Sequence, residues 1–161
     1  MIRVPPDRLA DDRGTLVQHL AFQRATLLIK VDGLDDEALR RPMTPSGLSL
    51  LGLVRHLTVT EHGWFLVILG GEPDPYVDLD EEAEFHVDRA EPTGAVLDLY
   101  RQTCARADEV VAAGDLDDVV ATPWGAPVNL RAILAHMIQE TARHNGHADL
   151  MREAIDGTTG S

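Results

Sequence analysis

Residues 130–155, LRAILAHMIQETARHNGHADLMREAI, carry the helical pattern that decides the fold of this 161-residue chain. Apolar side chains such as Ile133 and Met137 recur at intervals of three or four residues, which is the spacing of one buried helix face. Asn129 is suited to cap the start of this helix, and Gly157 is suited to end it. The pattern predicts a long amphipathic helix.

Three further segments have the same periodicity, while strand signals are nearly absent. A short turn of helix is expected at 34–39, followed by a Pro-rich break. Four long amphipathic helices of this kind predict an all-α, antiparallel four-helix bundle with one long connection. We expect a single domain spanning 1–161, with its core at about 11–157. The three further helices are expected at about 11–31, 46–69 and 93–113.

The long connection, from Gly71 to Pro92, contains nine acidic residues and one Arg. Loops of this length are uncommon in compact domains, where they are often lids or exposed excursions. The favoured interpretation is a solvated acidic loop. The alternative is a segment that covers a site.

Composition excludes several classes of function. The net charge of −13 argues against a nucleic-acid-binding surface and against attraction to anionic membranes. No apolar stretch is long enough to span a bilayer, and the segment after Met1 lacks the apolar core of a signal peptide. The single cysteine, Cys104, cannot form an internal disulfide, and it lies on an apolar helical stripe as a small core residue. These features predict a soluble cytoplasmic protein.

Polar side chains form a row along the last helix. At about 100° per residue, four of them fall within an arc of about 80° at the edge of the apolar face. The spacing of Glu140 and His144 lets both side chains reach one metal ion. The alternative is an ordinary intrahelical pair. The row consists of His136, Glu140, His144 and His147.

His56 lies at the margin of the apolar face of the helix at 46–69. Two His nitrogens and one carboxylate oxygen make a three-ligand set, which is typical of catalytic zinc with one open position. The same set resembles the non-haem iron triad, so spacing alone does not fix the metal. A satisfied core histidine remains the alternative for His56.

The remaining candidates have weaker signals. His136 and His147 are each a potential outer-shell residue or proton carrier at such a site. His62 is expected to face away from His56, and neither His19 nor His86 belongs to an evident cluster. Gly146, inside the last helix, is expected to allow close packing of a neighbour.

Two stretches of sequence resemble the DinB-like superfamily. LVRHL at 53–57 with EHGWF at 61–65 resembles its second helix, and HMIQETARHNGHAD at 136–149 resembles its last helix. The similarity extends over about 11–157. It implies a four-helix bundle with a divalent-metal site between helices. Many members have three histidines, the last two spaced H-x-x-x-H.

This chain has Glu140 at the first of those two positions. A His, Glu, His set is similar to the branch that contains mycothiol-dependent maleylpyruvate isomerase and related thiol S-transferases. The ligands implied by the resemblance are His56, Glu140 and His144. Zinc is the first expectation, with nickel or iron as alternatives.

The main functional hypothesis is a metal-dependent S-transferase that uses a low-molecular-weight thiol, such as mycothiol, on a small electrophile. His147 or Asp149 would move protons or orient a ligand, with His136 and Asp149 in the outer shell. One alternative is a metal-dependent hydrolase with the same ligands. The other is a non-catalytic, metal-binding stress or scaffold protein. A homodimer is a further expectation that the sequence leaves open.

Overall fold

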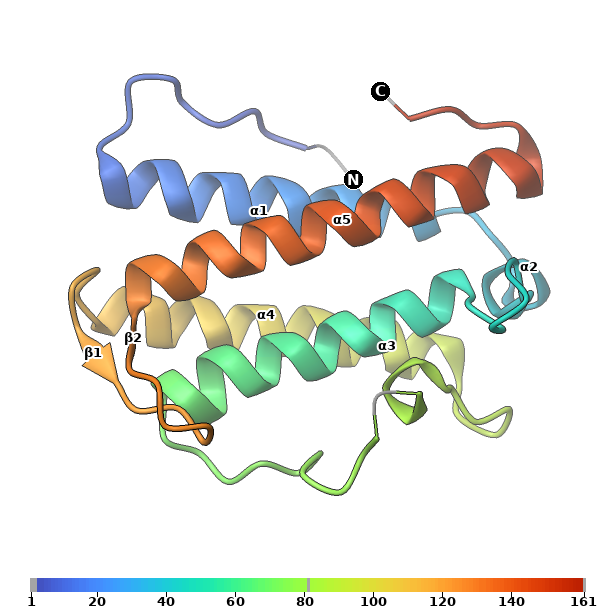
Figure 1. The fold of residues 1–161 in the computed structure, drawn as a ribbon. Helices are drawn as coiled ribbons and strands as arrows, with labels where there is room; N and C mark the ends of the chain where they lie inside the picture. Colours follow the sequence, from blue (N-terminus) through green and yellow to red (C-terminus); the bar gives the residue numbers. More distant parts are fainter. Residues whose placement is uncertain (1–2, 81, 161) are drawn as a thin grey trace.

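The computed structural model describes residues 3–80 and 82–160 as a bundle of long helices (Figure 1). This confirms the predicted all-α fold. A short helix, α2 (Asp36–Arg40), lies between the first two long ones. None of the described helices is both long and apolar enough to cross a membrane. The long helices are α1 (Asp12–Val31), α3 (Leu50–Glu61) with its continuation η1 (His62–Leu69), α4 (Thr93–Ala113) and α5 (Leu130–Asp156).

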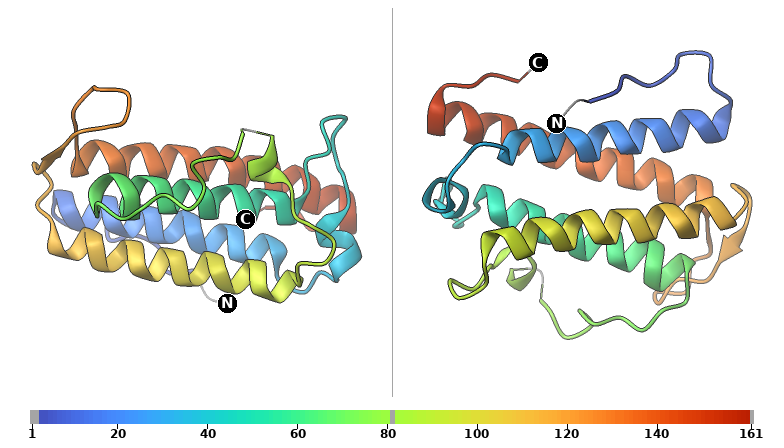
Figure 2. Two further views of the ribbon diagram at one scale, coloured as in Figure 1. Left: turned by 90° about the horizontal axis from the view of Figure 1, so that it is seen from below. Right: turned by 180° about the vertical axis from the view of Figure 1, so that it is seen from behind.

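The long connection sets the directions of the helices. It runs back along α3 and contains one short 3₁₀ turn, η2 (Ala83–Phe85), so α4 begins near the start of α3 (Figures 1 and 2). α3 and α4 therefore run in the same direction, while α1 and α5 run together in the opposite one. Side-chain contacts agree with this arrangement, because Arg131 pairs with Asp12 at one end of α5 and Arg152 bonds the Lys30 carbonyl near the other.

The second long helix differs from its expected form. It begins at Leu50, because Ser49 caps it by accepting a hydrogen bond from the Gly52 N–H. After Glu61 the chain continues as a π-helix over His62–Leu69. Its wider turns shift each following side chain around the axis, so positions worked out at 100° per residue do not apply beyond Glu61.

A small sheet is present where an irregular segment was expected. β1 (Val119–Val120) pairs with β2 (Val128–Asn129) in antiparallel fashion, and the second strand leads directly into α5. Asn129 caps α5 through the Ala132 N–H, and Gly157 ends it with a φ of 79°. Both expected ends of α5 are confirmed.

A buried ion pair lies between two apolar clusters of the core. On α1, Arg24 lies between Leu20 of one cluster and Leu27 of the other. Its guanidinium makes a bidentate pair with Glu61, at 2.6 and 2.5 Å, and a further bond to Asp108 at 2.7 Å. Burial works against the charge on Arg24, but the Glu61 carboxylate outweighs it and raises the pKa of Arg24. The pair ties α1, α3 and α4 together.

Replacing Glu61 with Ala should lower the free energy of unfolding by about 3 kcal/mol, because it leaves a buried guanidinium without its main partner. Urea denaturation followed by circular dichroism measures this. Asp98→Ala is the control, since the Asp98–Arg101 pair is exposed and its loss should cost less than about 0.5 kcal/mol. Equal effects of the two substitutions would contradict a structural role for the buried pair.

Candidate metal centre

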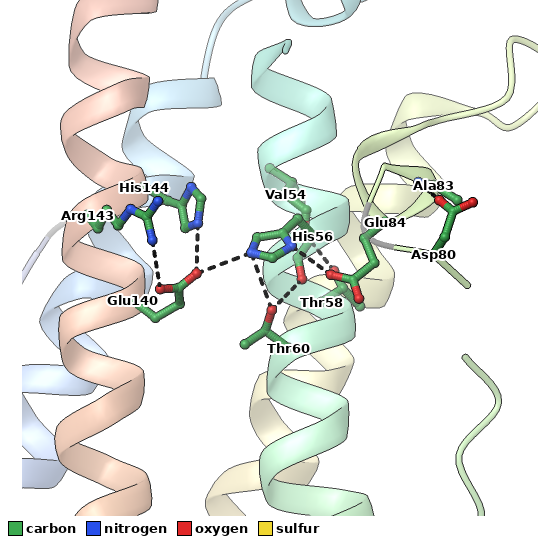
Figure 3. Close-up of polar contacts among 10 residues, drawn as sticks. All are labelled: Val54, His56, Thr58, Thr60, Asp80, Ala83, Glu84, Glu140, Arg143 and His144. Atoms are coloured by element: carbon green, nitrogen blue, oxygen red, sulfur yellow. Dashed lines mark hydrogen bonds and ion pairs between the residues drawn. The ribbon is translucent and has the colours of Figure 1, made fainter. Parts of the chain in front are cut away.

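Three side chains predicted to bind a metal come together between α3 and α5 (Figure 3). His144 Nε2 lies 2.9 Å from Glu140 Oε1, and His56 Nε2 lies 3.3 Å from the same oxygen. The ligand atoms of all three lie within 4.8 Å of one another. His144 is buried, while His56 and Glu140 are exposed over 12% and 17% of their side chains. The site is thus shielded but reachable.

The two separations from Glu140 Oε1 suit a small divalent cation. Bonds of about 2.0–2.1 Å with tetrahedral or octahedral angles place neighbouring ligand atoms roughly 2.9–3.4 Å apart. Two imidazole nitrogens and a carboxylate oxygen are donors that zinc and iron accept. The residues present therefore fit the expected metal, although the same distances also satisfy ordinary hydrogen bonds to Glu140.

The second nitrogen of His56 has a partner that the sequence did not predict. His56 Nδ1 lies 2.9 Å from Glu84 Oε2, and the Phe85 ring stacks on the imidazole with centroids 4.1 Å apart and planes at 12°. Both residues belong to η2, in the connection interpreted as a solvated loop. That interpretation is wrong for this turn, because Glu84 and Phe85 are only partly exposed and pack on α3.

The electrostatics of the site favour metal-binding protonation states. Burial lowers the pKa of His144, and the hydrogen bond to Glu140 offsets this only in part. Burial alone would raise the pKa of Glu140, but hydrogen bonds from His144 and His56 outweigh it and leave that pKa below its usual value. At neutral pH this gives a neutral imidazole next to a carboxylate, which is the state that binds a metal.

The three residues predicted to surround the metal ligands each have a different partner. His147 Nδ1 lies 3.4 Å from His144 Nδ1, on the side of that ring away from Glu140. The His136 ring lies against Trp64, with centroids 4.7 Å apart. Asp149 pairs with Lys30 of α1 at 2.6 Å. Among these three, only the His147 side chain has a hydrogen bond or ring contact with a predicted ligand in the described part of the chain.

Other expectations have mixed outcomes. The His62 ring packs edge-on against Tyr76 in the long connection, 5.4 Å away between centroids, so it faces away from His56 as expected. The expected close packing at Gly146 is wrong. This glycine is exposed, and a Cβ added there would meet no atom within 4 Å.

A cleft of about 1020 Å³ opens beside the three side chains. His144 reaches its wall from α5, and the η2 turn forms the opposite side. Its lining combines both signs of charge with one phenyl ring and three imidazoles, so it suits a polar ligand that carries many hydrogen-bonding groups. Residues on its wall include Arg55, Phe85, Glu91, Arg143, His144 and His147.

Cys104 is unsuited to act as a nucleophile. Burial is the main cause that raises the pKa of its thiol, to about 12, and the nearby Glu61 carboxylate adds to the effect. The thiolate is the reactive form of cysteine, so almost none is present at neutral pH. Any thiol chemistry at this site therefore requires a thiol from outside the chain.

The fold is that of a DinB-like protein. It is similar to the crystal structure of a DinB-like protein from Bacillus cereus ATCC 10987, with a TM-score of 0.66 and 20% sequence identity over 91% of this chain and 95% of that one. Residues 15–157 match the family model of mycothiol S-transferase. The chain belongs to the mycothiol S-transferase family. None of the curated proteins matches it.

At pH 8, Cys104 should react with a thiol reagent at least about a thousandfold more slowly in the folded protein than in urea, because a thiol pKa near 12 replaces the usual value of about 8.5. Absorbance after addition of a disulfide reagent measures the rate. A native rate within tenfold of the unfolded rate would contradict the buried, protonated thiol.

Proposed function

We propose that this protein is a divalent-metal-dependent S-transferase that joins a low-molecular-weight thiol, such as mycothiol, to a small electrophile. One observation carries the proposal: two histidines and a carboxylate from two helices converge at the edge of a cleft. Membership of the mycothiol S-transferase family supports the thiol as one substrate.

His56, Glu140 and His144 would hold the metal, with zinc as the first choice. When bound, such a cation lowers the pKa of a thiol and stabilises the thiolate. The sulfur of the substrate then forms a bond to the electrophilic carbon, and a leaving group departs with its electron pair. His147, next to His144 on the cleft wall, would take up the thiol proton.

We propose that the electrophile binds at an aromatic cluster, which lies beside the same two helices. His136 lies about one helical turn before Glu140 on α5, and its ring touches Trp64 of η1. Trp64 in turn packs edge-on against Trp124, with centroids 5.5 Å apart, and Trp124 is 61% exposed. Exposed aromatic rings of this kind offer an apolar wall for a planar or aromatic electrophile.

The position of His147 favours an open site over a closed structural one. It approaches Nδ1 of His144, whereas Nε2 of that ring faces Glu140. Among the described residues, the group of potential ligands therefore has three members and no fourth His, Cys, Asp or Glu. This arrangement suits a substrate in the remaining position, as in catalytic zinc sites.

Protein purified without a metal-affinity tag should contain about one equivalent of divalent metal and conjugate thiol to a chlorinated aromatic only when metal is present. Single substitutions to Ala at His56, Glu140 and His144 should each remove the metal and the conjugation. Elemental analysis and product detection by mass spectrometry measure the two effects. His19→Ala is the matched control, because His19 is exposed on α1.

Several results would contradict the proposal. Full metal content in all three variants would place the metal elsewhere. Metal-dependent turnover of an ester or amide without thiol would indicate a hydrolase instead. Bound metal whose removal unfolds the protein, with no conjugation of any common thiol, would indicate a structural role.

Trp124→Ala should raise KM for an aromatic electrophile about two- to tenfold, which corresponds to the loss of one aromatic contact. KM for the thiol and the metal content should stay unchanged, because Trp124 lies in the loop before β2 and away from the cleft wall. Steady-state kinetics with an aromatic and an aliphatic electrophile measure this. An equal change for both electrophiles would count against the aromatic wall.

A further inference from the structure

We propose that the η2 turn is a positioning clamp for His56, and that Glu84 is the residue that fixes the imidazole for metal binding. The inference rests on the proposed function, since it takes His56 as a metal ligand. It adds a residue from the long connection to a site otherwise built from α3 and α5.

The hydrogen bond from His56 to Glu84 selects one form of the ring. A carboxylate only accepts hydrogen bonds, so Nδ1 of His56 must carry a proton and donate it across the 2.9 Å to Glu84 Oε2. With Nδ1 protonated, a metal ion that replaced the proton on Nε2 would meet the lone pair of that atom, which lies 3.3 Å from Glu140 Oε1. Glu84 and the metal would thus occupy opposite ends of the imidazole.

The stacked ring of Phe85 fixes the plane of the imidazole. The two planes differ by 12° at a centroid separation of 4.1 Å, so rotation of the His56 ring about its Cβ–Cγ bond would push it into Phe85. Phe85 also packs against the apolar cluster formed by α1, α3, α4 and α5. The clamp is therefore anchored in the core.

Gly52 allows the turn to approach α3 closely. It lies one helical turn before His56, and a Cβ at this position would lie 2.6 Å from the backbone carbonyl oxygen of Phe85. A backbone atom cannot move aside as a flexible side chain can, so any larger residue at position 52 would displace the turn. Gly52 thus allows Glu84 and Phe85 to reach His56.

Partners of this kind orient metal-bound histidines in many proteins, and their loss typically weakens metal binding by about 10- to 100-fold. Glu84 makes such a hydrogen bond to His56, whereas its neighbour Glu82 is exposed. Both carry the same charge within two residues of each other. Comparing substitutions at these two positions therefore distinguishes the effect of the specific hydrogen bond from the effect of the negative charge of the connection.

Zinc affinity should be measured by competition with a chromophoric chelator for the wild type, Glu84→Ala, Glu84→Gln and Glu82→Ala. We expect Glu84→Ala to weaken zinc binding about 10- to 100-fold and Glu82→Ala to change it less than about twofold. Glu84→Gln should recover part of the loss, because its amide oxygen still accepts the bond from Nδ1.

Two further readouts separate positioning from a general loss of structure. The visible absorption spectrum of the cobalt-loaded protein should change in Glu84→Ala and stay as in wild type in Glu82→Ala. Gly52→Ala should weaken zinc binding in the same direction as Glu84→Ala, while the far-ultraviolet circular dichroism of all variants stays that of the wild type.

The possible failures can be told apart. If the wild type binds zinc and Glu84→Ala binds it equally well, the clamp is overturned and the proposed function stands. Equal losses of zinc affinity in Glu84→Ala and Glu82→Ala would also overturn the clamp. They would indicate that the negative charge of the connection, and not the hydrogen bond, supports zinc binding. A wild type that binds no zinc, cobalt or nickel would overturn both.

Discussion

One oxygen of Glu140 joins the two halves of the candidate site. Ring nitrogens from His56 on α3 and His144 on α5 both approach it, so the site exists only while these helices keep their relative position. Three polar side chains facing one another inside an apolar bundle are costly unless a proton or a metal ion links them. We propose that a metal ion is the link.

The rest of the structure holds these helices in place. The Arg24–Glu61 pair fixes the end of α3 against α1 and α4, five residues beyond His56. On the outer side, the connection that reverses the chain direction returns along α3 and covers His56 with Phe85. The same long connection that makes α3 and α4 run in parallel thus also brings a carboxylate to the candidate metal centre.

Sequence patterns predicted the parts of the fold that depend on local periodicity. The ends of α5, the extent of α1 and the meeting of Glu140 with His144 all follow from helical spacing within one segment. His56 was reached by its place on a helix margin and by resemblance to the DinB-like superfamily. The contact with Glu84 spans 28 residues of chain through an irregular connection, and the Arg24–Glu61 pair spans 37. Neither contact has a periodic signal, and the π-helix after Glu61 has no simple signal either.

Anomalous diffraction from crystals of the zinc-loaded protein, recorded on both sides of the zinc absorption edge, tests the central claim most directly. We expect a single strong anomalous peak between His56 Nε2, Glu140 and His144 Nε2, on the side facing the cleft. A zinc peak only at other residues, or no zinc peak at all, would contradict this expectation. The convergence on Glu140 would then be a hydrogen-bonded cluster and not a metal centre.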